Sequence, residues 1–342
     1  MTGLACILGN FACVQKKVLY NMHIMEWIQI GIWTLYLLFA LFALVRGADM
    51  FVEGAKDIGA SLGMSSFAIG VLIVGFGTSF PELASSVAAI LQNSPELVVA
   101  NAVGSNITNI LLVVGFVVVM GGKIVIKRDL IKTELPIFFI ASAHFILMIQ
   151  DGVIDRLESV LLVATFAAYI WYLFGEAEHD DKVDLIKGAG RRPQLKANAL
   201  AFLVMGLGAV LVGAHFSIQM VINIGTALTI PIELISIFAI ALGTSLPELF
   251  VAIKSVRAGH GEMAIGSIFG SNAFNILMVV GIPGLFISLP ATLVVTSVGV
   301  PILIAASAIF FVNGLARQIM RWEGMMMLIF FAFFLLKLID FL

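Results

Sequence analysis

Long apolar stretches separated by short polar segments run along the whole chain, and most of them are about 20 residues long. A helix of that length crosses the ~30 Å hydrocarbon core of a bilayer. The pattern therefore predicts an all-α polytopic membrane protein. Ten transmembrane helices are expected, at roughly 26–45, 60–91, 96–120, 132–150, 156–174, 197–222, 230–256, 262–283, 290–312 and 322–341.

The composition agrees with a chain that resides in lipid. Of its 342 residues, 61% are hydrophobic and only 12% are charged, with a mean hydropathy of +1.10, whereas a soluble domain has about a quarter of its residues charged. The sequence contains no phosphate-binding loop, zinc motif or nucleic-acid surface. ATP-driven transport and a nucleic-acid partner are therefore not expected. Cys6 and Cys13 imply no disulfide framework.

The distribution of lysine and arginine predicts the orientation in the membrane. Fifteen of the nineteen fall in connections that follow odd-numbered helices, and the other side holds Lys16, Lys17, Arg156 and Lys337. Cytoplasmic loops are enriched in these residues. We therefore expect the hydrophilic connection at 176–196 to be cytoplasmic and both termini to lie outside. Residues 1–24 place apolar residues before their charges, the reverse of a signal peptide, and are treated as an extension without assigned function.

Two copies of one unusual motif interrupt the second and seventh predicted helices. GFGTSFPEL at 75–83 and ALGTSLPEL at 241–249 agree in six of nine positions. A second motif follows each copy: GSNITNILLVVG at 104–115 and GSNAFNILMVVG at 270–281 agree in nine of twelve. A single offset of 166 residues aligns both pairs, so the chain contains an internal repeat.

Each half contains five predicted helices, an odd number, so the second half enters the membrane inverted relative to the first. Inverted repeats with helices interrupted at matching positions are typical of secondary transporters, whose substrate site lies at the midplane between the repeats. The expected organisation is a first membrane repeat over 25–175, a linker over 176–196 that is too short to fold alone, and a second membrane repeat over 197–342.

The prolines of the motif predict broken helices. Pro81 and Pro247 lack a backbone donor and clash with the preceding turn. We expect carbonyls near 75–77 and 241–243 to lose their helical partners, and in hydrocarbon each such group must be satisfied by protein, water or an ion. Carbonyl oxygens directed at a cavity are good ligands for hard cations.

The side chains of the motifs provide further oxygens. At the i, i+4 spacing that shares a helix face, a hydroxyl accompanies each Glu and each Asn of the two repeats. Two inverted copies would gather two carboxylates, two amides and four hydroxyls, a set that contains oxygen ligands and no sulfur and so suits Na⁺ and Ca²⁺. The residues are Thr78, Glu82, Ser105, Asn109, Thr244, Glu248, Ser271 and Asn275.

Other interpretations assign these residues different roles. Each proline could be a structural kink and each glutamate a packing residue. His144 and His215 lie in apolar spans and could move protons, but each is alone and unmatched at the repeat offset, which favours packing roles. Asp49, Glu53 and Asp57 could line a cytoplasmic vestibule or form a charged helix end.

Two further function classes could use the same motifs. A channel could use the same oxygen ligands to conduct ions without coupling the flow of one ion to that of another, but the inverted repeat argues against a channel. An intramembrane hydrolase could use Ser79 or Ser245 as its nucleophile, but it would need a His or Lys base, and no base recurs at the repeat offset.

The paired G-T-S-x-P-E and G-S-N-x-x-N segments resemble the alpha repeats of the calcium:cation antiporter superfamily, the sodium/calcium exchangers, and most closely their compact prokaryotic members. The resemblance extends from about Gly31 to Asp340. It implies ten helices in two inverted five-helix repeats with broken core helices. It also implies that the first and sixth helices are long, tilted gating helices that slide across the core.

The resemblance implies an ion-binding role for each motif residue. Glu82 and Glu248 correspond to the central carboxylates shared by Ca²⁺ and Na⁺, with the hydroxyls of Thr78 and Thr244 beside them and Ser79 and Ser245 at the helix breaks. Ser105 and Ser271 correspond to ligands of the outer Na⁺ positions, and Asn109 and Asn275 to the polar groups near the middle. Gly75 and Ala241 correspond to positions whose backbone carbonyls bind ions.

The implied activity is Na⁺/Ca²⁺ antiport by alternating access, with Na⁺ entry driving Ca²⁺ out across a prokaryotic plasma (inner) membrane. The sequence departs from the family at Asn275, where many exchangers carry aspartate. An amide can coordinate an ion but supplies no charge, so the count of Na⁺ ions and coupling to H⁺ or K⁺ stay open. The resemblance implies no resident cofactor and no obligatory protein partner.

Overall fold

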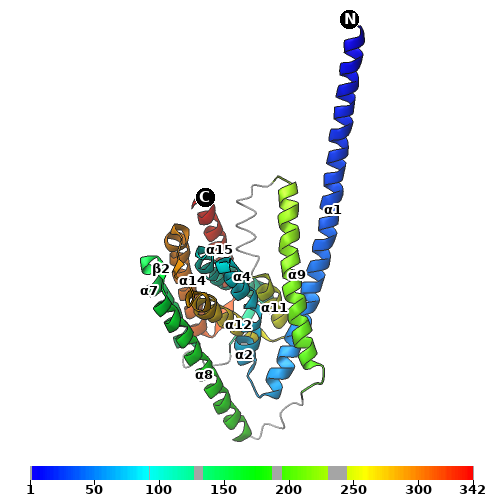
Figure 1. The fold of residues 1–342 in the computed structure, drawn as a ribbon. Helices are drawn as coiled ribbons and strands as arrows, with labels where there is room; N and C mark the ends of the chain where they lie inside the picture. The colour runs from blue at the N-terminus through cyan, green and yellow to red at the C-terminus, as the bar shows by residue number, and fades with distance from the viewer. Residues whose placement is uncertain (1, 92, 127–133, 187–194, 230–244, 342) are drawn as a thin grey trace.

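The protein is described by a computed structural model that covers residues 2–91, 93–126, 134–186, 195–229 and 245–341. It is built almost entirely of helices (Figure 1). Within these residues, eight segments are long and apolar enough to cross a membrane: Trp27–Ser61, Ser66–Leu91, Glu96–Gly121, Arg156–Leu173, Ala199–Ala227, Gly261–Gly284, Val295–Ala316 and Arg321–Asp340.

Two further predicted spans are partly represented among the described residues. An apolar helix of fewer than 18 residues begins the fourth span at Leu135, and the seventh span, 230–256, is described from Ser245 onward. The membrane fold is therefore confirmed, and the part of the ten-helix prediction that rests on 230–244 lies outside the described residues.

The first half begins with one very long helix and continues with shorter ones. Its elements are α1 Thr2–Ser61, α2 Ser66–Ile69, the π-helical η1 Gly70–Gly75, α3 Phe76–Thr78, α4 Phe80–Leu91, α5 Glu96–Ile107, the π-helical η2 Thr108–Val114, α6 Gly115–Gly121, β1 Lys123–Val125, α7 Glu134–Met148, the 3₁₀-helical η4 Ile149–Asp151, β2 Val153–Ile154 and α8 Arg156–Ile186.

The second half follows a similar order. Its elements are α9 Ala199–Ala227, α11 Leu246–Arg257, α12 Gly261–Phe274, the π-helical η5 Asn275–Val279, α13 Gly281–Gly284, β3 Leu289–Pro290, the π-helical η6 Val295–Gly299, α14 Val300–Ala316, β4 Gln318–Met320 and α15 Arg321–Phe341. Shifting α4 by 166 residues gives the bounds of α11, and the same shift takes the end of α1 to the end of α9.

Two short antiparallel strand pairs join the halves and keep the same register. β1 pairs with β4, with Lys123 opposite Met320, and β2 pairs with β3, with Ile154 opposite Leu289. The 166-residue shift converts the first residue pair into the second, with the two halves exchanged. A pseudo-two-fold relation between the halves requires this exchange, so the repeat seen in the sequence is also a repeat of the tertiary structure.

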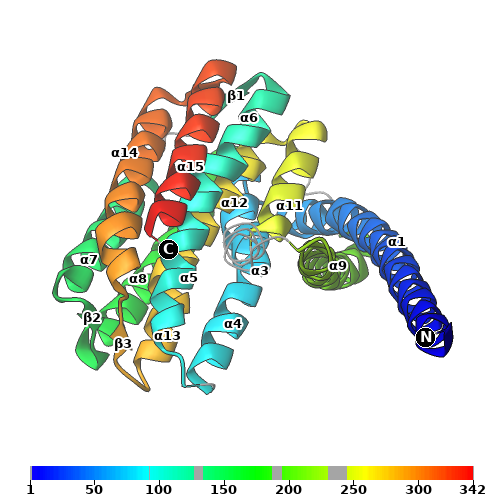
Figure 2. The ribbon, with the colours of Figure 1, turned by 90° about the horizontal axis from the view of Figure 1, so that it is seen from above.

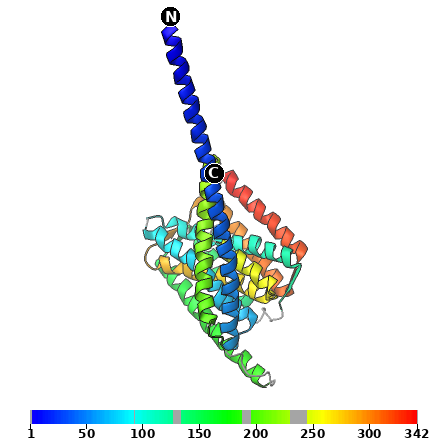
Figure 3. The same cartoon turned by 90° about the vertical axis from the view of Figure 1, so that its right-hand side faces the viewer.

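The helices α1 and α9 lie side by side at one side of the molecule, as the views in Figures 2 and 3 show. Their membrane segments, 35 and 29 residues long, are the longest of the described spans. They run at a steep angle to the core helices α5 and α12 (Figure 2). The length that the resemblance implied for the first and sixth helices is present.

Glycines bring the backbones of α1 and α9 into contact. A Cβ added to Gly206 would lie 2.4 Å from the backbone nitrogen of Phe51, and one added to Gly47 would lie 2.8 Å from that of Val210. Small residues at helix interfaces in lipid allow this close approach, which replaces the missing hydrophobic driving force with dispersion contacts.

The boundary of the first helix differs from the prediction. The first span was expected to end near residue 45, yet α1 continues to Ser61. The stretch 46–59 contains three glycines but no proline, and its charged residues lie toward the helix end, so no proline terminates the helix earlier. Asp49, Glu53 and Asp57 therefore lie on α1 itself.

The glycine contacts predict that Gly206→Val weakens the packing of α9 on α1. Two extra methyl groups and a Cβ would collide with the backbone of α1, and overpacking typically costs about 1–3 kcal/mol. Thermal unfolding of the purified protein in detergent should show a lower transition temperature. Gly208→Val is the matched control on the same helix, because a Cβ there meets nothing within 4 Å; equal effects of the two variants would contradict the packing argument.

Candidate functional site

The helix breaks occur at matching serines immediately before the prolines. Ser79 has φ −89° and ψ 3°, and Ser245 has φ −91° and ψ 3°. Each serine is followed by a new helix in which Pro81 or Pro247 is the second residue. A proline is tolerated in the first helical turn because its missing N–H would lack a helical partner there anyway. The predicted breaks are confirmed, with the same backbone conformation in both halves.

The backbone carbonyls at the first break are better satisfied than the sequence suggested. The Gly75 carbonyl accepts from the Ser79 backbone N–H at 3.2 Å, from the Thr78 hydroxyl at 3.2 Å and from the Ser271 hydroxyl at 3.0 Å. The expectation that this carbonyl loses its helical partner is wrong, because the chain stays helical up to Thr78. The Gly77 carbonyl does lose its helical donor, since Pro81 has no N–H.

Hydroxyl and carboxylate groups of the two halves meet at the breaks. The Ser79 hydroxyl donates to Oε1 of Glu248 at 3.3 Å, and the hydroxyls of Thr78 and Ser271 lie 3.5 Å apart. All four side chains are at most 1% exposed. The structure therefore brings together the predicted site residues Gly75, Thr78, Ser79, Glu248 and Ser271.

A second group connects Ser105 to the backbone at Glu82. The Asn101 side-chain amide donates to the Glu82 backbone carbonyl and to the Ser86 hydroxyl, both at 3.1 Å. The Ser105 hydroxyl donates to the side-chain oxygen of Asn101 at 3.5 Å. Glu82 itself is fully buried. Asn101 was not identified from the sequence, where it precedes the GSN motif and has Ser267 at the repeat offset.

Amides of the two GSN segments meet between the halves. The Asn109 amide donates to the side-chain oxygen of Asn272 at 3.2 Å, and the Asn106 amide donates to the backbone oxygen of Asn272 at 3.0 Å. Asn106 and Asn272 were also missed. The available signal was their position as the third residue of the repeated G-S-N-x-x-N motif, 166 residues apart.

Several buried oxygens at the site have no hydrogen-bond donor within the described part of the chain. They are Oε2 of Glu248, Oγ of Ser245 and the amide oxygens of Asn109 and Asn275. An unpaired buried polar group costs about 1–3 kcal/mol, and more if charged. A hard cation would satisfy such oxygens, so the donor set fits one. No three His, Cys, Asp or Glu residues cluster in the described ranges; Thr244 and Ala241 lie outside them.

The family model for sodium/calcium exchanger proteins matches residues 32–175 and 198–339, nearly all of the chain. The chain belongs to the sodium/calcium exchanger family. It is accordingly a secondary antiporter and not an enzyme. The match supports the resemblance that the repeated motifs carried.

Individual relatives of this exchanger family match over most of their length. Sodium/calcium exchanger MaX1 of Methanosarcina acetivorans is 32% identical, over 89% of this chain and 97% of the relative. The inner membrane protein YrbG of Escherichia coli is 33% identical, over 74% and 79%. The solved structure of the sodium-calcium exchanger NCX_Mj superposes with a TM-score of 0.76 at 29% identity, over 89% of this chain and 98% of that one.

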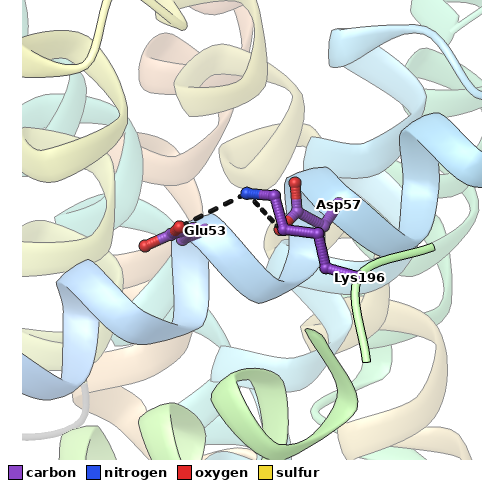
Figure 4. A network of polar contacts seen from close by, with 3 residues as sticks. All are labelled: Glu53, Asp57 and Lys196. Atoms are coloured by element: carbon purple, nitrogen blue, oxygen red, sulfur yellow. Dashed lines mark ion pairs between the residues drawn. The ribbon is translucent and has the colours of Figure 1, made fainter. Parts of the chain in front are cut away.

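Charged residues of this exchanger also surround a cavity of about 720 Å³ at the end of α1. Lys196 lies 3.0 Å from Asp57 and 3.6 Å from Glu53 (Figure 4), and Lys254 lies 2.9 Å from Asp49. Lys196 donates a hydrogen bond to Asp57, and this bond raises the pKa of the Lys196 ammonium and favours its charged form. The acidic residues of α1 therefore line a charged, lysine-paired vestibule.

The two histidines of the apolar spans lie on exposed helix surfaces and not among the buried site residues. His144 on α7 and His215 on α9 are both exposed on their helices, and the site atoms described above are buried. Neither histidine makes a described hydrogen bond to a site residue. The structure gives them no part in the site.

The contacts of Ser271 predict that Ser271→Ala lowers stability. The variant removes the donor to the Gly75 carbonyl, and a net hydrogen bond contributes about 0.5–1.5 kcal/mol. Thermal unfolding in detergent should report this loss. Ser307→Ala is the control, because Ser307 is 8% exposed and its hydroxyl has no partner among the described residues. A control that loses as much stability as Ser271→Ala would contradict the assigned role.

Proposed function

We propose that this chain exchanges Na⁺ for Ca²⁺ across the membrane by alternating access, with Na⁺ entry driving Ca²⁺ out. The observation that carries the proposal is the contact of Ser79 with Glu248, which joins a hydroxyl of one repeat to a carboxylate of the other at matching helix breaks. The exchangers named among its relatives, MaX1 and NCX_Mj, support the choice of ions.

The proposed ion site draws equally on the two repeats. Glu82 and Glu248 supply the charge, the hydroxyls and amides supply neutral oxygens, and the carbonyls at two helix breaks complete the set. Each ion in turn neutralises carboxylates that would otherwise cost about 2.5–3.5 kcal/mol each at the bilayer centre. The proposed ligands are Gly75, Thr78, Ser79, Glu82, Ser105, Asn109, Ala241, Thr244, Ser245, Glu248, Ser271 and Asn275.

The charge of this site bears on the exchange ratio. Two carboxylates give −2, which one Ca²⁺ neutralises, whereas three Na⁺ would leave +1. Asn275 adds an oxygen without charge or a titratable proton. A site of this charge permits electrogenic exchange and depends on the two glutamates alone for its charge balance.

The proposed gate is the pair formed by α1 and α9. Their glycine contacts favour movement as one unit, and their contacts with α11 are far less extensive than those with each other. In the proposed arrangement, repeats 25–175 and 197–342 alternate around the site, the 176–196 linker is cytoplasmic and both termini lie outside. The membrane would be the prokaryotic plasma (inner) membrane, which the name of the relative YrbG, an inner membrane protein, supports.

The function is tested by Ca²⁺ flux into proteoliposomes with Na⁺, K⁺ and pH gradients imposed one at a time. We expect an outward Na⁺ gradient alone to drive Ca²⁺ uptake. Uptake driven by a pH gradient without Na⁺ would replace the proposal with H⁺/Ca²⁺ antiport, and an absolute requirement for K⁺ would make the exchange K⁺-dependent. Non-saturating, uncoupled flux would indicate a channel.

The two carboxylates predict the phenotype of their amide variants. Glu248→Gln and Glu82→Gln each remove one of the two negative charges proposed to pair with Ca²⁺, and removing one partner of a buried pair of opposite charges costs about 2–5 kcal/mol. Neither variant should bind Ca²⁺ at concentrations that saturate the wild type, as measured by ⁴⁵Ca²⁺ binding to purified protein. Glu158→Gln, a half-buried position at the start of α8 outside the site, is the control. Near-normal binding by either site variant would contradict the site assignment.

A further inference from the structure

The amide contacts between the two GSN segments are asymmetric, although the segments themselves are repeats. The 166-residue offset relates Asn106 to Asn272 and Asn109 to Asn275. The pseudo-two-fold relation therefore gives every hydrogen bond between these residues a possible mate with the two halves exchanged.

Two hydrogen bonds are formed and their two mates are not. Asn109 donates to the side-chain oxygen of Asn272, and Asn106 donates to its backbone oxygen. The mates would be donation by Asn275 to the side-chain oxygen of Asn106, and by Asn272 to the backbone oxygen of Asn106. Within the described residues, these two are not formed.

The unpaired amide atoms are the ones that the missing bonds would use. Oδ1 of Asn106, Nδ2 of Asn272 and Nδ2 of Asn275 are buried and have no partner in the described part of the chain. All three residues are at most 1% exposed. The backbone segments that would carry both sets of hydrogen bonds are already in contact, since α5 contacts η5 and α12 contacts η2. The leftover donors and acceptors therefore match one alternative arrangement of the same four amides.

The orientation of an amide decides what it offers a cation. An asparagine side chain presents an oxygen on one side and an NH₂ group on the other, and its terminal torsion is soft. An NH₂ group facing a cation repels it, whereas an oxygen binds it. A neighbouring acceptor that holds the NH₂ group therefore leaves the oxygen for the ion. In the structure, Asn272 holds the NH₂ group of Asn109, and Oδ1 of Asn109 has no other described partner.

We propose that Asn106 and Asn272 are positioning residues of the ion site. Asn272 orients the amide of Asn109 and Asn106 orients the amide of Asn275, so that one amide oxygen from each repeat is directed at the cation. The two arrangements alternate between the repeats, and the structure holds the one that orients Asn109. The inference rests on the proposed function, because it assigns the amides of that same site.

This arrangement gives a reason for asparagine at position 275. A carboxylate there would have no N–H to donate to Oδ1 of Asn106, which would then stay buried and unpaired in both arrangements. The amide supplies the missing donor and an ion-binding oxygen together. Asn275 is thus complementary to Asn106, as Asn109 is to Asn272.

A double-mutant cycle on Asn272 and Asn109 tests the proposal. Leucine approximates the shape of asparagine without its hydrogen bonds, so the variants are Asn272→Leu, Asn109→Leu and the double variant, with Ca²⁺ dissociation constants measured by titration calorimetry. We expect each single variant to bind Ca²⁺ about tenfold more weakly, the ratio that one net hydrogen bond of about 1.4 kcal/mol gives. The double variant should be no weaker than the weaker single one, because Asn272 acts through Asn109.

The second cycle, on Asn106 and Asn275, should behave in the same way and provides an independent measurement if the first pair folds poorly. Asn313→Leu is the control, since Asn313 on α14 is also a buried asparagine with an unpaired amide nitrogen but lies outside the site. Its dissociation constant should equal that of the wild type.

The outcomes separate this inference from the function on which it rests. Additive losses in both cycles, or unchanged Ca²⁺ affinity in Asn272→Leu and Asn106→Leu, would overturn the positioning role while leaving Na⁺/Ca²⁺ exchange by the wild type intact. Absence of Ca²⁺ binding and of Na⁺-driven flux in the wild type would overturn both.

Discussion

The rest of the structure depends on one constraint: polar groups buried in lipid must be satisfied inside the protein. Glu82 and Glu248 are buried with almost no exposure, and buried hydroxyls and amides surround them. No single helix can supply enough partners for two carboxylates. Two matching helix breaks bring hydroxyls of one repeat to the carboxylate and carbonyl groups of the other, as Ser79 does for Glu248 and Ser271 for Gly75.

Inverted symmetry provides this arrangement from one repeated sequence pattern. The strand pairs β1–β4 and β2–β3 keep equivalent registers on the two halves, and the breaks at Ser79 and Ser245 share one backbone conformation. The symmetry is not complete in its hydrogen bonds, however. The amides of Asn106, Asn109, Asn272 and Asn275 form one set of hydrogen bonds, and the set that the pseudo-two-fold relation would generate is not formed. A transporter that alternates between two states needs its two repeats to adopt different arrangements in this way.

Much of the fold was readable because lipid makes the sequence pattern strict. Apolar runs of about 20 residues can only be helices there, so the spans followed from length and hydropathy. Hydropathy does not predict the end of a helix that continues through charged residues. Helix α1 continues to Ser61 because the charged residues at 49, 53 and 57 are tolerated near its end. The π-helical segments at η2 and η5 have no sequence signature either, since they depend on how the packed turns fit.

The sequence alone determined that two repeats meet at two Pro-Glu motifs, because a membrane cannot accept an acid and a broken helix without partners. It also determined the oxygen chemistry of the residues that gather there. Tertiary structure decided which oxygens pair with one another. The sequence placed Asn106 and Asn272 in the repeated GSN motif but did not assign them partners, which appear only when helices from opposite repeats come within hydrogen-bond distance. Asn101 has no motif of its own, and its role comes from its contact with the Glu82 carbonyl on the neighbouring helix. Such contacts depend on side-chain direction across an interface, which spacing along one helix does not encode.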